Sequence, residues 1–79
     1  MDQQTLIDTI LREAKRDFFN GRGRIFKSEF LRGYNISEEA FMEAITTMKK
    51  LWNALEIIQS PLNEEIFYFN LGGSNIFSE

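Results

Sequence analysis

The chain has 79 residues, a formal net charge of −3 at pH 7, and 43% hydrophobic residues. A chain this short forms one small domain and buries only about 60% of its unfolded surface, so its core must be dense. Eight Phe, two Tyr and one Trp provide that density, whereas the lack of Cys and His excludes disulfides, thiolate metal sites and histidine catalysis. No apolar run approaches the about 20 residues that cross a bilayer, and the start lacks a signal-peptide pattern. We therefore expect a soluble cytoplasmic protein that contacts no membrane.

The charge is unevenly distributed between the two halves of the chain. Residues 1–34 carry seven basic and five acidic side chains, whereas residues 35–79 carry two basic and seven acidic ones. The overall balance argues against a strongly basic nucleic-acid binder, and the basic half favours acidic partners. The aromatic share of 14% also favours a homodimer or another protein partner.

The first half of the chain predicts two helices separated by a loop and a very short strand. Apolar residues at helical spacing predict an amphipathic helix over about residues 3–19, namely Leu6, Ile7, Ile10, Leu11, Ala14, Phe18 and Phe19. Asn20-Gly21 ends that helix, Arg22-Gly23-Arg24 reads as a flexible basic loop, and Ile25-Phe26 as the strand. A brief second helix over residues 28–32 is expected to end at Gly33.

A third helix has the strongest local signals. Ser37 is placed to cap it, Glu38 and Glu39 suit the positive end of the helix dipole, and Ile36 with Phe41 can form a hydrophobic staple. Lys49 and Lys50 suit the opposite end, so the helix should end near Trp52, with Asn53 as a left-handed closing residue.

The remainder predicts a β-hairpin followed by a tail. Residues 55–59 are short and β-branched, residues 65–71 alternate between apolar and other side chains, and the proline-led stretch 60–64 predicts the turn between them. Residues 72–79 begin with Gly72-Gly73 and are expected to form a flexible C-terminal tail; the alternative is that Ile76 and Phe77 fold back onto the domain or pair with a second copy.

This order of elements resembles a winged helix-turn-helix domain. The apolar positions Phe30, Phe41, Ile45 and Met48, with Ser37 seven residues after Phe30, match the spacing of that fold. The resemblance implies a small α+β winged helix over residues 1–71, with three helices, a very short first strand and a hairpin wing. One departure is that the Asn53 region replaces the glycine that usually precedes the second strand, which predicts an altered wing angle.

The resemblance implies a DNA-binding transcription regulator, expected as a dimer on double-stranded DNA. In such domains the third helix enters the major groove, while the start of the second helix contacts the phosphate backbone. The residues expected toward bases are Thr46, Thr47, Lys49 and Lys50, and those expected on the backbone are Arg24, Lys27 and Ser28.

The acidic residues favour a second hypothesis, a non-catalytic protein-protein interaction module. Carboxylates early in the third helix and in the expected wing would oppose phosphates, and these are Glu38, Glu39, Glu43, Glu64 and Glu65. As some domains of this fold do, the chain would use this acidic surface to dock a protein. Compact acidic winged helices of this kind are also similar to small proteins of phages and mobile elements.

Two further patterns resemble ligand sites but have simpler explanations. Gly21-Arg22-Gly23-Arg24 follows a helix, whereas a nucleotide-binding loop follows a strand, so a solvated connection is the better interpretation. The carboxylates at the start of the third helix are typical dipole partners. Without a histidine, a cysteine or a calcium-loop pattern, we expect no enzyme, no cofactor and no metal.

Overall fold

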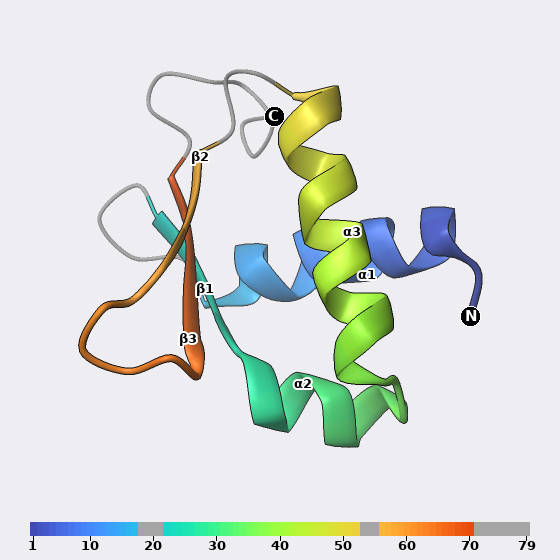
Figure 1. Ribbon diagram of the computed structural model, residues 1–79, viewed down its shortest axis with the longest axis horizontal. Helices are drawn as coiled ribbons and strands as arrows, with labels where there is room; N and C mark the ends of the chain where they lie inside the picture. The colour runs from blue at the N-terminus through green and yellow to red at the C-terminus, as the bar shows by residue number, and fades with distance from the viewer. Residues whose placement is uncertain (18–21, 53–55, 71–79) are drawn as a thin grey trace.

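A computed structural model describes residues 1–17, 22–52 and 56–70. Along this part of the chain the elements are α1 (Gln3–Arg16), β1 (Arg22–Phe26), α2 (Lys27–Tyr34), α3 (Glu38–Leu51), β2 (Glu56–Gln59) and β3 (Ile66–Asn70). The strands form an antiparallel sheet in the order β1-β3-β2, and Figure 1 shows this sheet beside the helices. The fold is therefore a small α+β fold, as the sequence predicts.

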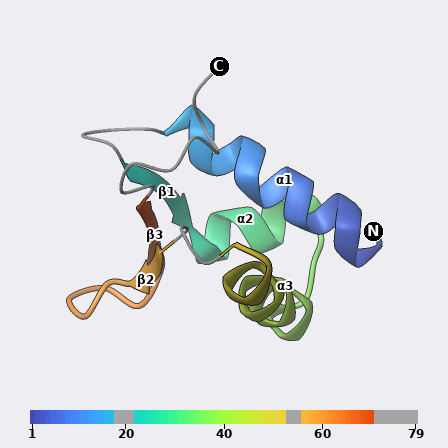
Figure 2. The ribbon, with the colours of Figure 1, turned by 90° about the horizontal axis from the view of Figure 1, so that it is seen from above.

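The helices cover one face of the sheet. α1 packs against β1 and α3 packs against both α1 and β2, whereas α2 continues directly from the end of β1 (Figures 1 and 2). The close packing of α1 on β1 requires Gly23, because a Cβ at this residue would lie 2.7 Å from the carbonyl oxygen of Ala14. A larger side chain here would separate the two elements.

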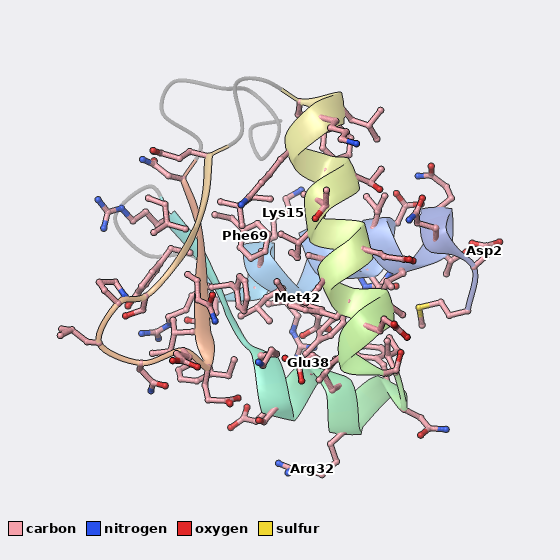
Figure 3. The ribbon with its side chains drawn as sticks, in the orientation of Figure 1. Asp2, Lys15, Arg32, Glu38, Met42 and Phe69 are labelled. Atoms are coloured by element: carbon pink, nitrogen blue, oxygen red, sulfur yellow. The ribbon has the colours of Figure 1, made fainter. Side chains whose placement is uncertain are left out.

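The core lies between the sheet and the helices and combines four phenylalanines with a larger number of aliphatic side chains. Phe69, on the central strand, is fully buried and lies between the sheet and α3 (Figure 3). Phe41 of α3 is also fully buried, and its ring meets Phe67 edge-on at 5.3 Å and Phe30 at 5.5 Å. Such ring pairs add about 0.5–1.5 kcal/mol each to the effect of burial. The aromatic and aliphatic residues together thus provide the dense core that a short chain needs.

Side chains cap the starts of the two long helices, and a backbone hydrogen bond closes the end of α3. Asp2 caps α1 by accepting from the amide of Thr5 at 2.8 Å, and Ser37 caps α3 by accepting from the amide of Ala40 at 3.1 Å. α3 ends at Leu51, and the Trp52 amide donates to the carbonyl of Met48 at 3.0 Å. The predicted cap and end of the third helix are confirmed.

Three boundaries predicted for the first half are wrong. The helix expected over residues 3–19 is helical over Gln3–Arg16, and residues 18–21 lie outside the described residues. Arg22-Gly23-Arg24 belongs to a five-residue strand instead of a loop, because pairing with β3 places Arg24 opposite Tyr68. α2 continues through Gly33 to Tyr34, and left-handed Asn35 ends it at φ 55°. The amide of Asn35 then donates to Leu31, which replaces the expected glycine stop.

The predicted hairpin is confirmed as β2 and β3. Its turn is held by Ser60, whose amide donates to Ile66 at 2.9 Å and whose Oγ accepts from the Leu62 and Asn63 amides. The Asn63 Oδ1 accepts in turn from the Glu65 amide at 3.0 Å. The expected closing residue Asn53 and the expected tail at residues 72–79 lie outside the described residues.

Candidate functional site: the α2–α3–hairpin junction and the outer face of α3

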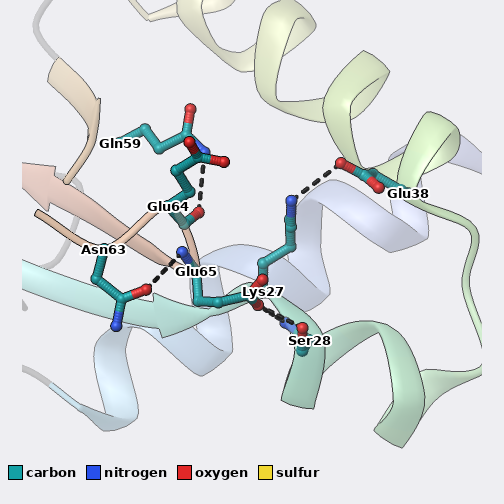
Figure 4. Close-up of polar contacts among 7 residues, drawn as sticks. All are labelled: Lys27, Ser28, Glu38, Gln59, Asn63, Glu64 and Glu65. Atoms are coloured by element: carbon teal, nitrogen blue, oxygen red, sulfur yellow. Dashed lines mark hydrogen bonds and ion pairs between the residues drawn. The ribbon is translucent and has the colours of Figure 1, made fainter. Parts of the chain in front are cut away.

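The starts of α2 and α3 and the end of the hairpin turn meet at one place, which we call the junction. It is formed by Lys27 and Ser28 of α2, Glu38 of α3, and Glu65 immediately before β3 (Figure 4). The four residues come from both sets that the sequence proposes, two from the DNA-contacting set and two from the acidic set. In the structure, residues expected to bind DNA are therefore hydrogen-bonded to residues expected to bind a protein.

Lys27 is held by carboxylates on two sides. Its Nζ lies 2.9 Å from the Glu38 Oε2, and the exposed fractions of the two side chains are 13% and 63%. The hydrogen bond to Glu38 raises the pKa of Lys27, and the charges of Glu65 and Glu64 raise it further. The Lys27 amide also donates to the carbonyl of Glu65 at 2.6 Å. Lys27 thus joins α2, α3 and the hairpin, and its positive charge is paired with a carboxylate of the same chain.

The start of α2 is capped by Glu65, a residue distant in the sequence, through hydrogen bonds from Ser28. Phe26 occupies the cap position of α2 and provides no side-chain hydrogen bond. Instead the Glu65 carboxylate accepts from the Ser28 amide at 2.9 Å and from the Ser28 hydroxyl. These bonds, the hydroxyl one first, lower the pKa of Glu65. Because Glu65 is 37 residues away, helix-cap patterns in the local sequence could not identify it.

Arg24, the third residue expected on the DNA backbone, is also paired. Its guanidinium forms two hydrogen bonds to Asp17 at 2.8 and 3.2 Å, and it lies 5.3 Å from the centre of the Phe26 ring. The bond to Asp17 and the charge of that residue raise the pKa of Arg24. Arg24 therefore fastens the end of α1 to β1.

The other predicted residues lie mostly on α3. Thr46, Lys49 and Lys50 are exposed, Thr47 is half-buried, and Glu39 and Glu43 are exposed toward the start of the helix. Glu64 is exposed in the hairpin turn, where its carbonyl accepts from Gln59 at 2.8 Å. We use the term outer face of α3 for the exposed residues Glu39, Glu43, Thr46 and Lys50. A shallow hollow of ≈ 530 Å³ follows this face and is lined by Gln3, Glu39, Met42, Glu43, Thr46 and Thr47.

The arrangement of α3 and the hairpin leaves this face open. Seen from above, α3 lies on the side of the molecule opposite α1, and the β2–β3 hairpin projects beside it (Figure 2). The face changes sign along the helix, because its acidic residues precede Thr46 and its lysine follows. Acidic, polar and basic side chains therefore follow one another along the exposed side of α3.

A second polar cluster, which the sequence did not indicate, joins α1 to α2. The Tyr34 hydroxyl donates to the Glu13 Oε2 at 2.6 Å, and Arg16 lies 3.2 Å from the same oxygen. Of these contacts the Tyr34 bond does most to lower the pKa of Glu13. The two bonded residues are 21 positions apart, so only the folded structure brings them together.

No known protein family, curated protein or solved structure matches the chain. None of the helices within residues 1–17, 22–52 and 56–70 is long and apolar enough to cross a membrane. Across the same residues, no group of three or more acidic side chains is arranged to hold a metal ion. The junction and the outer face of α3 are therefore the features of the described residues that bear on function.

Proposed function

We propose that the chain is a non-catalytic winged-helix domain that docks a protein partner through the outer face of α3 and the adjacent hairpin. The order of the helices and strands supports this proposal, as does the pairing of β1 with β3 at the far side of the hairpin. The hairpin would be the wing and α3 the recognition helix. A cytoplasmic location suits such a module.

The pairing within the junction is the observation that carries the proposal. Winged helices on DNA offer the start of their second helix to phosphates, yet here Lys27 is bonded to Glu38 and Ser28 to Glu65. A phosphate at this position would have to displace two carboxylates and would remain beside them. Glu39 and Glu43 extend the repulsion along α3, and Glu64 extends it along the hairpin turn. The same surface is suited to a partner with basic and polar groups.

A specific observation also favours DNA as a second candidate ligand. Lys49 and Lys50 are exposed beside Thr46, and neither lysine is in an ion pair with any other described residue. A duplex contacting only the second half of α3 would avoid the junction. Under this alternative the chain is the transcription regulator that the resemblance implies, and Thr46 and Thr47 would face the bases.

A fluorescence-anisotropy titration with random duplex DNA separates the two candidates. For a docking module we expect no binding at low or physiological salt, since the net charge is −3. The Glu39→Lys/Glu43→Lys variant changes that charge from −3 to +1 and should gain salt-sensitive binding. Binding by the unchanged chain that is lost in Lys49→Glu/Lys50→Glu would instead establish DNA as the ligand.

A photo-crosslinking residue placed on α3 tests protein docking directly. Substituted for Thr46 on the outer face, it should form adducts with protein in the cells that make this chain. Substituted for Arg32, which points away from the molecule on α2 (Figure 3), it should not give the same adducts. Adducts that are equal at both positions, or that survive Glu39→Lys/Glu43→Lys, would contradict docking at this face.

A further inference from the structure

The charges on the outer face of α3 are arranged symmetrically about its centre. The four residues Glu39, Glu43, Thr46 and Lys50 are separated by four, three and four positions, which is the spacing of a helix–helix contact seam. Their centre lies between positions 44 and 45. If a second α3 lies antiparallel about that point, position 39 faces position 50 and position 43 faces position 46. Each acidic end of the face then meets the lysine end of the other copy.

We infer that the protein partner of this face is a second copy of the same chain, with the two α3 helices antiparallel about a two-fold axis. The inference rests on the proposed docking role of α3 and names its partner. Two-fold symmetry uses the same surface on both copies, so a face can serve only if it is complementary to itself. Each dimer would contain Glu39 opposite Lys50 twice.

The residues beside the seam support the same arrangement. Met42 and Thr47 are both half-buried and lie on opposite sides of the face, so Met42 of one copy would meet Met42 of the other, and Thr47 would meet Thr47. Met42 would provide an adaptable apolar contact there. The outer face of α3 carries two carboxylates and one lysine, and the exposed Lys49 beside it balances the remaining negative charge, so two copies meet without net repulsion. The two Glu43 carboxylates lie near each other across the axis and repel. Each also lies one helical turn from position 39, which faces Lys50 of the other copy, so the attraction to that lysine offsets the repulsion.

The fold leaves room for this contact. α3 is on the outside of the molecule, with α1 behind it and the hairpin to one side (Figure 2). Its core-facing residues Phe41, Ala44, Ile45 and Met48 are buried, so the helix presents the polar seam and keeps its apolar stripe inside. A partner with an apolar face would find little complementary surface, whereas another α3 matches the sequence of charges.

Sedimentation equilibrium of the full chain tests the inference through a charge-reversal cycle. We expect concentration-dependent dimers that weaken as salt is added. Glu39→Lys or Lys50→Glu alone replaces two attractive contacts in each dimer with two repulsive ones and should weaken association by about tenfold. The double variant Glu39→Lys/Lys50→Glu restores opposite charges across the axis and should recover dimerisation.

The same cycle excludes a simple effect on folding. Each single reversal opposes the dipole of α3, so the double variant should be the least stable in urea although it dimerises again. Asp8→Lys and Arg12→Glu make the same charge changes on exposed positions of α1 and should leave association unchanged. A chain that stays monomeric at the highest soluble concentration would overturn the second-copy inference. If crosslinks from Thr46 to a different protein persisted in that case, the docking proposal would stand. Equal effects of the α1 and α3 reversals would also overturn the inference.

Discussion

At the scale of single residues, the bond between Tyr34 and Glu13 offers the clearest test of a partly buried polar contact. The hydroxyl donates at 2.6 Å to a carboxylate whose side chain is 23% exposed, so solvent only partly screens the interaction. We expect Tyr34→Phe to lower the free energy of unfolding by about 1 kcal/mol at neutral pH. Urea denaturation followed by circular dichroism would measure the loss.

The cost of Tyr34→Phe should depend on pH in a defined direction. The bond lowers the folded pKa of Glu13 below its ordinary value of 4.5, so its contribution is fully present above that value. It is lost as the pH falls through the folded pKa, and the variant and the unchanged chain should then converge. Tyr68→Phe on β3 serves as a control for losing a hydroxyl. A difference that persisted undiminished below the folded pKa would show that the ring packing, and not the bond, was altered.

At the scale of secondary structure, two glycines predict opposite outcomes for the same substitution. A Cβ on Gly33 meets nothing within 4 Å, and the residue lies inside α2, so Gly33→Ala should raise the free energy of unfolding by about 0.5–1 kcal/mol. A Cβ on Gly23 would lie 2.7 Å from the carbonyl oxygen of Ala14 and 2.9 Å from its Cβ. Gly23→Ala should therefore lower that free energy by about 1–3 kcal/mol, because α1 and β1 must separate.

Urea midpoints of the two alanine variants provide the measurement. Each variant adds one methyl group, so a difference in sign isolates the local environment. If Gly33→Ala destabilised the chain, residue 33 would be closing the helix, as the sequence alone suggests, instead of continuing it. A neutral Gly23→Ala would mean that α1 is not packed on β1 at this point.

Gly23 and Gly33 show which element boundaries the local sequence can predict and which it cannot. The third helix was predictable to within a residue because its cap, staple and last-turn lysines are all encoded within residues 36–52. The second helix was not, because Gly33 suggests an end whereas Asn35 provides the left-handed residue that ends it. The sequence predicts the strand at Ile25-Phe26, which is confirmed, but it predicts a loop at Arg22-Gly23-Arg24 because these residues have weak strand propensity, and only pairing with β3 extends β1 through them.

At the scale of the whole molecule, the candidate site shows what sequence could not supply. The sequence identified the charged residues of the junction but assigned Lys27 and Ser28 to one surface and Glu38 and Glu65 to another. The fold brings them within hydrogen-bond distance across 11 and 37 positions. The sequence shows which residues are charged. Whether a charged side chain is available to a ligand depends on which residues the fold places beside it.

Stability across the pH range should reflect these contacts together. Hydrogen bonds lower the pKa values of Asp2, Glu13 and Glu65, which hold the start of α1, the contact between α1 and α2, and the start of α2. All three contributions are complete above the ordinary carboxyl values and are lost as the pH falls through the folded values, below about pH 4. The raised pKa of Lys27 acts in the opposite range, because its contribution is complete below 10.5 and is lost as the pH rises beyond it.

We therefore expect a plateau of unfolding free energy between about pH 5 and pH 10, with a decline on each side. Urea denaturation at closely spaced pH values would trace it, and Glu65→Gln should flatten part of the acid decline because glutamine does not titrate. Lys27→Met should likewise remove part of the alkaline decline, and it should also weaken the acid decline slightly because the charge of Lys27 helps to lower the pKa of Glu65. An acid decline that was identical in Glu65→Gln would mean that the Glu65 carboxylate does not hold the start of α2. The junction would then be free to exchange its internal pairs for a ligand, and these pairs would no longer oppose phosphate binding there.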